Sequence, residues 1–255
     1  MALFTDGPII MAKDLQQYEA SVLNDANAEG IDVAAKVSLA QQDVGSELLL
    51  FLLRRSTFRD DWPNVRRSVG LGDVVVTDML RQWHINKTLA MVYQDAYNNQ
   101  LNDRYQGKWK QYEQLAKRSS QAYFQLGAGV VADPVPKATI PAVTTVPGNG
   151  NGAVFYAAVT WVNAAGEEGA PSDFAEASTL PGEVLSVTPT GLPPNAVGWN
   201  TYVGASPGAM SRQNSIPLAL GTAFAMTGAL SAGAPLPTGQ KPTWFVVDRH
   251  YIERG

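Results

Sequence analysis

The chain has 255 residues, a formal net charge of −4 and no cysteine. This length exceeds the usual single-domain size and predicts two domains, while the missing cysteine excludes disulfides, iron–sulfur clusters and thiolate catalysis. No apolar run approaches the roughly 20 residues that span a bilayer, and residues 1–10 lack the features of a secretory signal. We therefore expect a soluble, unsecreted protein without membrane contact.

The composition changes near Gly129. The part before it holds 14 of the 19 basic and 15 of the 23 acidic residues, and the part after it is rich in Gly, Pro, Thr and Val. Neither part has the bulk positive charge of a nucleic-acid binder. We expect an α+β multidomain chain with a helical domain over 1–130, a Pro/Gly linker over 131–152, an antiparallel β-sandwich over 153–240 and a C-terminal arm over 241–255.

The front part has the apolar spacing of a bundle of about four helices. The first is expected over 12–27, and Asp32 is the expected cap of the second. The leucine-rich run at 48–53 predicts that the second helix is covered on most sides, at the centre of the bundle. Thr77 is the expected cap of the third helix, and the fourth is expected over 103–127.

The fourth expected helix carries a heptad-like row of large residues. Packing against the third helix is the favoured interpretation of this row, because apolar stripes at helical spacing usually form core. Packing between subunits is the alternative, since Tyr and Trp are enriched at interfaces. The row consists of Tyr105, Trp109, Tyr112, Ala116, Ser119, Tyr123 and Leu126.

A connection over 56–72 separates the second and third expected helices, and arginines are concentrated in and just before it. Guanidinium groups pair with acidic surfaces or with phosphates, so the cluster is a candidate contact for a partner or for passing DNA. A solvated loop, partly neutralised by Asp60 and Asp61, is the favoured alternative. The arginines are Arg54, Arg55, Arg59, Arg66 and Arg67.

The rear part begins with a proline-rich stretch at 128–147 that predicts an extended linker or a sheet edge. The sequence GNGNG at 148–152 has no following Lys and Ser or Thr, so a hairpin tip or flexible loop is preferred to a phosphate loop. Strands are expected at 153–163 and at four later places separated by Gly, Pro and Asn turns, at the interval expected of a sandwich. The core candidates are Trp161, Trp199, Tyr202 and Phe224.

Three acidic residues, Glu167, Glu168 and Asp173, lie in a predicted turn after the first of these strands. They lack the spacing of a calcium loop, so we expect them to be solvated and to bind no metal.

The C-terminal arm is too apolar for a solvated terminus. In an extended chain Trp244, Val246 and Ile252 would share one side. The other side would carry Phe245, Val247 and Tyr251. The arm is therefore expected either to complete a sheet in its own domain or to add a strand to a neighbour.

Catalytic signatures are not found. The two histidines, His84 and His250, fall in different domains without a carboxylate spaced for catalysis or metal binding. No Walker loop, nucleophile elbow or nucleotide fingerprint is present. We expect no enzyme activity, no cofactor and no metal.

The front part resembles the helical head-to-tail connector (adaptor or head-completion) proteins of tailed bacteriophages. The resemblance covers about residues 10–135 and lies in DLQQYE at 14–19, EGIDVAAKVSLA at 29–40 and WHINKTLAMVYQDAY at 83–97. The rear part, with GEEGAPS at 166–172 and GWNTYVG at 198–204, resembles the fibronectin-like or immunoglobulin-like modules of phage structural proteins.

The resemblance implies a structural virion protein of the phage neck, assembled in the host cytoplasm. It implies a homo-oligomeric ring, commonly a dodecamer, that joins the portal protein of the capsid to a downstream neck or tail protein, with genomic DNA passing close by. In that family a terminal segment often reaches into the portal, and residues 244–252 or 1–10 are the candidates here. The added β module departs from the minimal connector.

The alternative function is a tail, baseplate or fibre component whose β-sandwich binds a host saccharide or protein. Exposed aromatic side chains around Trp199 and Tyr202 would favour it, because sugar faces stack on aromatic rings. A third possibility, a small lysin or peptidase with a wall-binding module, lacks a recognisable acid, base or nucleophile.

Overall fold

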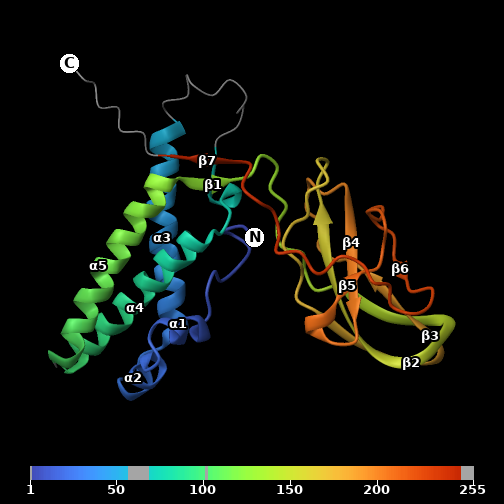
Figure 1. Ribbon diagram of the computed structural model, residues 1–255, viewed down its shortest axis with the longest axis horizontal. Helices are drawn as coiled ribbons and strands as arrows, with labels where there is room; N and C mark the ends of the chain where they lie inside the picture. Colours follow the sequence, from blue (N-terminus) through green and yellow to red (C-terminus); the bar gives the residue numbers. More distant parts are fainter. Residues whose placement is uncertain (1, 57–68, 101–102, 248–255) are drawn as a thin grey trace. The chain divides into compact units, whose positions relative to one another are not determined.

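The computed structural model describes residues 2–56, 69–100 and 103–247 (Figure 1). The described residues form five α-helices, a two-stranded sheet and a five-stranded sheet, and both sheets are antiparallel. The expectation of an α+β chain, helical first and mainly β afterwards, is therefore confirmed.

The chain divides into two compact units. The helical unit consists of Gly7–Val130 and Pro242–Gly255, and the β unit consists of Met1–Asp6 and Val131–Lys241. The helical unit ends and the β unit begins after Val130, close to the change in composition at Gly129. What the composition does not indicate is that each unit also contains a short segment from the opposite end of the chain.

The helical unit contains three long helices, a pair of short ones and a small sheet. Trp83 and Tyr93, buried on the second long helix, pack against rings of the third. The elements of this unit, in chain order, are α1 (Ala12–Tyr18), α2 (Val22–Ala28), α3 (Val33–Ser56), the 3₁₀ turn η2 (Leu71–Asp73), α4 (Asp78–Gln100), α5 (Asp103–Leu126), β1 (Ala128–Val130) and β7 (Trp244–Val246).

The single helix expected over 12–27 is wrong, because the chain turns between α1 and α2. Glu19 adopts an extended backbone, with φ −141° and ψ 95°. Its carboxylate lies 3.0 Å from the Ser21 hydroxyl and accepts a hydrogen bond of 3.2 Å from Lys108 on α5. Because Glu19 makes these contacts in an extended conformation, α1 ends before it and does not continue into α2.

Both predicted caps are confirmed. The Asp32 carboxylate accepts a hydrogen bond of 3.1 Å from the Ala35 amide at the start of α3. The Thr77 hydroxyl lies 3.4 Å from the Leu80 amide at the start of α4. The sequence therefore located the beginnings of these two helices.

The expectation that α3 is covered on most sides near its end is wrong. Val44 and Leu48 are fully buried on the face that meets α4, but Leu50 is 55% exposed and Leu49 is also exposed. The buried face of α3 packs mainly on α4, and the opposite face stays uncovered.

The predicted row on α5 faces α4, as the core interpretation requires. The rings of Tyr93 on α4 and Tyr112 on α5 stack with centroids 5.8 Å apart, and Trp83 lies 5.8 Å from Tyr123. Five members of the row are buried, Trp109 is half-buried and Leu126 is exposed. A role in contacts between subunits is therefore left only to Trp109 and Leu126.

The β unit contains one hydrogen-bonded sheet of five strands, in the order β5-β4-β2-β3-β6. Its long hairpin of β2 and β3 provides most of the pairing, and β4 joins the second half of β2. The strands are β2 (Ala142–Val162), β3 (Ala175–Thr188), β4 (Gly198–Gly204), β5 (Ser211–Arg212) and β6 (Phe224–Ala225), and the 3₁₀ turn η3 (Pro207–Ala209) follows β4.

The linker predicted over 131–152 is corrected by β2, which begins at Ala142, but the alternative of a sheet edge fits residues 142–147, which pair with β3 and not with β4. The tip predicted at 148–152 is wrong. The glycine-rich sequence lies inside β2, where the register with β3 shifts between Pro147 and Asn151. A Cβ at Gly150 would lie 1.8 Å from the Glu183 carbonyl oxygen. The glycines therefore permit a bulge, a feature that bends a strand without ending it.

The predicted core of the β unit is largely confirmed, because Trp161, Trp199 and Tyr202 are buried and Phe224 is partly buried. The pairing gives a single sheet, so the two-sheet sandwich stays a prediction.

The expectation of solvated acids is wrong for Glu168. Its carboxylate accepts hydrogen bonds of 2.6 Å from Tyr202 and 2.7 Å from Thr160. Arg212 Nη1 lies 3.7 Å from the other carboxylate oxygen. Glu167 is also partly buried and accepts a hydrogen bond from Gln240, whereas Asp173 is exposed beside Lys137.

Candidate interaction surfaces

The C-terminal strand β7 pairs with β1 in the helical unit, with Phe245 opposite Gly129. A Cβ at Gly129 would lie 2.8 Å from Pro242 Cγ, and a Cβ at Gly127 would lie 2.7 Å from Val247 Cγ1. Gly127 also has a φ of +102°, which L side chains rarely adopt. The absence of a side chain at these two glycines leaves the space in which β7 packs. The site at which β7 packs is therefore formed by residues more than 110 positions earlier in the chain.

The predicted arm is only partly described. Val246 is buried, Trp244 and Val247 are partly buried, and the Phe245 ring is 50% exposed. The arm does not complete a sheet in the preceding β unit, because β7 joins the helical unit of its own chain. Tyr251 and Ile252, also predicted to bind a partner, lie outside the described residues, and docking of the arm on a neighbour stays a prediction.

The arginine cluster is described at its first two members. Arg54 is exposed in the last turn of α3, and the backbone of Arg55 continues that helix. The remaining predicted contacts, Arg59, Arg66 and Arg67, lie outside the described residues.

Two regions that the sequence singled out separately meet at one end of the helical unit (Figure 1). Phe51, in the penultimate turn of α3, contacts Phe124 near the end of α5, with ring centroids 4.6 Å apart. The chain then passes from α5 through Gly127 into β1, which pairs with β7. We name this region the α3–α5 end.

The α3–α5 end exposes large apolar side chains beside a positive charge. Leu126, the last residue of α5, is 64% exposed, and Phe245 and Leu53 are each 50% exposed. Arg54 follows Leu53 directly. Uncovered apolar groups with an adjoining arginine are typical of protein interfaces.

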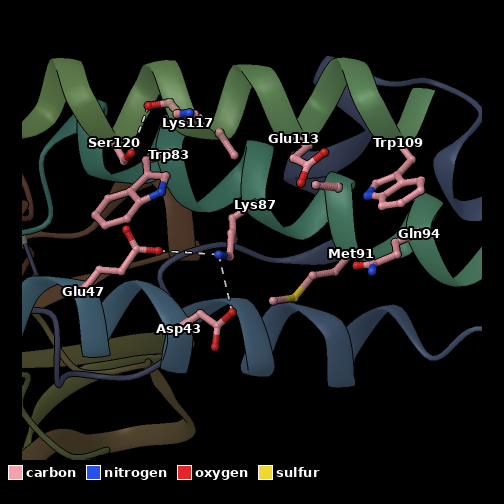
Figure 2. A pocket seen from close by; sticks show the side chains of 12 residues that line it. Asp43, Glu47, Trp83, Lys87, Met91, Gln94, Trp109, Glu113, Lys117 and Ser120 are labelled. Carbon is pink, nitrogen blue, oxygen red and sulfur yellow. Dashed lines mark hydrogen bonds and ion pairs between the residues drawn. The ribbon is translucent and has the colours of Figure 1, made fainter. Parts of the chain in front are cut away.

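A groove runs over α4 between α3 and α5 (Figure 2). It has a volume of about 380 Å³, and Lys87 of α4 lies within it, 3.5 Å from Asp43 and 3.5 Å from Glu47 of α3. On the α5 side Glu113 and Lys117 are exposed, and Trp109 lies half-buried toward one end. No sequence pattern indicated this groove, because it depends on the spacing of three helices.

Polar side chains fasten the α1–α2 pair to the long helices. Lys108 Nζ lies 3.2 Å from Glu19 and 3.4 Å from Asp25, and it donates to the Tyr93 hydroxyl at 3.3 Å. Tyr112 also donates to Glu19, at 3.0 Å. Because every polar group named here has a partner, we interpret the network as structural.

The network shifts the pKa of its members. Burial raises the pKa of Glu19 and of Asp25, but hydrogen bonds from Ser21 and Lys108 outweigh it, so the pKa of each carboxyl is below its usual value. Burial raises the pKa of Tyr93 to about 12. The carboxylates and the phenol thus keep their usual charge states near neutral pH.

His84 is fully buried, with Nε2 2.9 Å from the Val37 carbonyl oxygen. Burial lowers its pKa below the usual value, which favours the neutral ring. His250 lies outside the described residues. Over the described ranges, no group of three or more His, Asp or Glu side chains is arranged to hold a metal ion, and no helix is long and apolar enough to cross a membrane.

Around Tyr202, the partly buried Tyr156 contacts the exposed Phe174, but Trp199 and Tyr202 themselves do not lie on the surface. Trp199 and Tyr202 are each at most 1% exposed, and Tyr202 is hydrogen-bonded to Glu168. A sugar ring cannot stack on them in this fold.

Comparisons with protein-family models, with curated proteins and with solved structures find no match to this chain.

Proposed function

We propose that the protein is a structural virion component of a phage neck, in which a ring of copies joins the portal protein to the next neck or tail protein. The observation that carries the proposal is the α3–α5 end, where exposed apolar side chains, Arg54 and the paired C-terminal strand β7 lie together. A binding role requires such a surface and no turnover.

The seat of β7 supports this proposal. A three-residue strand gains little by itself, yet both glycines of its seat fit it closely. Its Phe245 ring stays half exposed, so the strand contributes a large side chain to the surface of the α3–α5 end. We infer that this end contacts the portal and that the β unit is an immunoglobulin-like module.

The test is co-sedimentation of the purified chain with portal rings. Leu126→Asp and Phe245→Asp should each weaken binding at least tenfold, because a charge would be desolvated at the interface. Leu180→Asp is the matched control, since Leu180 is 66% exposed in the β unit. Normal portal binding by both test variants, with unchanged thermal melting, would refute the proposed role of the α3–α5 end.

Binding of a host surface stays the alternative function. Glycan-array binding by the full chain, together with failure to join portal rings, would replace the neck assignment by that of a tail or fibre component.

A further inference from the structure

The outer face of α3 carries a long exposed row without a single charged side chain. From Ala35 to Leu49 the row steps by four and three residues, and Leu50 lies four residues after Ser46, so the row follows one helix face. Its charged neighbours Asp43 and Glu47 lie to one side, where they bind Lys87. We name this row the α3 stripe, and it consists of Ala35, Leu39, Gln42, Ser46, Leu49 and Leu50.

A solvated helix face normally carries charged residues, and interface cores are depleted of them. Over its 16 residues the α3 stripe is about 24 Å long, at 1.5 Å per residue. Leu39 and Leu50, near its two ends, are 46% and 55% exposed. The stripe therefore has the composition and the length of a helix that packs against another surface.

The groove over α4 is the complementary surface within the same unit. Between Lys87 and Gln94 of α4 the floor of the groove carries no charged residue. It is formed there by the small residues Ala90 and Ala116 and by Met91, which is partly buried. The groove is lined from Trp83 to Gln94 on α4 and from Trp109 to Ser120 on α5. This is about 18 Å of helix at 1.5 Å per residue, so the groove can accommodate the central part of the stripe.

The charges flanking the two surfaces are also complementary. Asp43 and Glu47 adjoin the stripe on α3 and retain exposed carboxylates, although a single lysine serves both. On the α5 rim of the groove, where Glu113 is also exposed, the Lys117 carbonyl accepts a hydrogen bond from Ser120, whereas its side-chain ammonium has no hydrogen-bond or ion-pair partner among the described residues. An incoming α3 with its acidic flank toward α5 would bring its carboxylates to Lys117.

We infer that a second copy of this chain is the occupant of the groove, and that its α3 stripe lies along α4 as a fourth long helix. The stripe and the groove are different surfaces of one unit, so the contact is head to tail. Contacts of this kind generate closed rings or filaments. The inference rests on the proposed function, for which it supplies the contact between neighbouring subunits.

The test uses the absence of cysteine from the chain. Single cysteines are introduced at the stripe centre, Ser46→Cys, and in the groove, Met91→Cys, and the variants are treated with a short bis-maleimide at increasing protein concentration. A mixture of the two variants should give cross-linked dimers, and each variant alone should give few. The double variant should give a ladder of trimers and larger species.

Ile216→Cys is the control partner for Met91→Cys, because Ile216 is exposed in the β unit. Adding Leu50→Glu to the Ser46→Cys variant should reduce dimer yield at least tenfold while leaving the melting temperature unchanged. Cross-linking of Ser46→Cys alone as efficient as in the mixture would indicate a symmetric contact. That result, or a mixture no more reactive than the control, would overturn the inference.

The same samples are examined with portal rings. If the chain joins the rings but stripe and groove do not cross-link there, the inference fails and the proposed function stands. If they cross-link in free solution but the chain never joins a portal ring, the proposed function fails and the subunit contact stands.

Discussion

The pairing of α4 with α5 depends on side-chain contacts, whereas the β2–β3 hairpin depends on a backbone position that has no space for a side chain. Trp83 and Tyr93 pack α4 on α5, and Lys108 fastens the α1–α2 pair. In the β unit, Gly150 and its neighbours allow the long strand β2 to continue through a bulge. A side chain can be trimmed with a graded loss of stability, but an added Cβ in the bulge has no space.

The largest expected effect comes from Gly150→Val. Its Cβ would lie 1.8 Å from the Glu183 carbonyl oxygen, so the hairpin must rearrange. We expect a cost above about 4 kcal/mol, with loss of the β-unit transition in calorimetry while the helical unit still melts. Gly208→Val is the control, because nothing lies within 4 Å of a Cβ at Gly208. Equal melting of both variants would contradict the bulge argument.

Trp83→Ala tests the aromatic contact of α4 with α5. Trp83 is 1% exposed and its ring lies 5.4 Å from Phe124 and 5.8 Å from Tyr123. Truncation should cost about 3–5 kcal/mol, measured by urea denaturation followed through helical circular dichroism. Leu50→Ala, on the exposed face of α3, should change stability by no more than about 0.5 kcal/mol.

Lys108→Met tests the polar fastening of the α1–α2 pair. It removes the cation shared by Glu19 and Asp25, which should cost roughly 1–3 kcal/mol. Hydrogen exchange should rise in α1 and α2 and stay slow in α4. Lys110→Met is the control, since the exposed Lys110 has no partner within the described structure. Uniform loss of protection in all helices would show that the network holds the whole unit.

Acid should loosen the contact of the α1–α2 pair with the long helices, and we expect this to be the smallest of the four effects. Glu19 and Asp25 have a lowered pKa in the folded state, so their contribution is complete above their unfolded pKa values, near pH 4, and is lost as the pH falls below them. Hydrogen exchange between pH 6 and 3 should show α1 and α2 opening before α5. Glu19→Gln combined with Asp25→Asn should flatten this dependence, and an unchanged slope would assign it to other groups.

Much of the fold followed from local patterns. The caps Asp32 and Thr77, the buried row on α5 and the buried rings of the β unit were predicted correctly. Each depends on neighbours a few residues away or on the spacing of apolar side chains. Where local patterns failed, at Glu19 and at 148–152, a distant partner decided the conformation: Lys108 in the first case and Glu183 in the second.

The candidate surfaces were predictable only in fragments. The sequence drew attention to the arginine cluster and to the apolar arm, but not to the meeting of Arg54 and β7 at one end of the helical unit. The leucines of α3 were expected to be covered, because a leucine-rich run gives no sign of how many neighbours a helix will have. The groove over α4 had no sequence signal at all.

The sequence by itself determined that the chain has a helical part and a β part, where they meet, and which face of α5 is core. These properties follow from composition and periodicity, which act over one or two helical turns or along one strand. Only the tertiary structure decided that the C-terminal strand returns to the helical unit, that Gly150 lies within a strand, and that one face of α3 stays uncovered. Each of these depends on residues far apart in the chain, whose meeting is set by packing and by the space left beside a glycine.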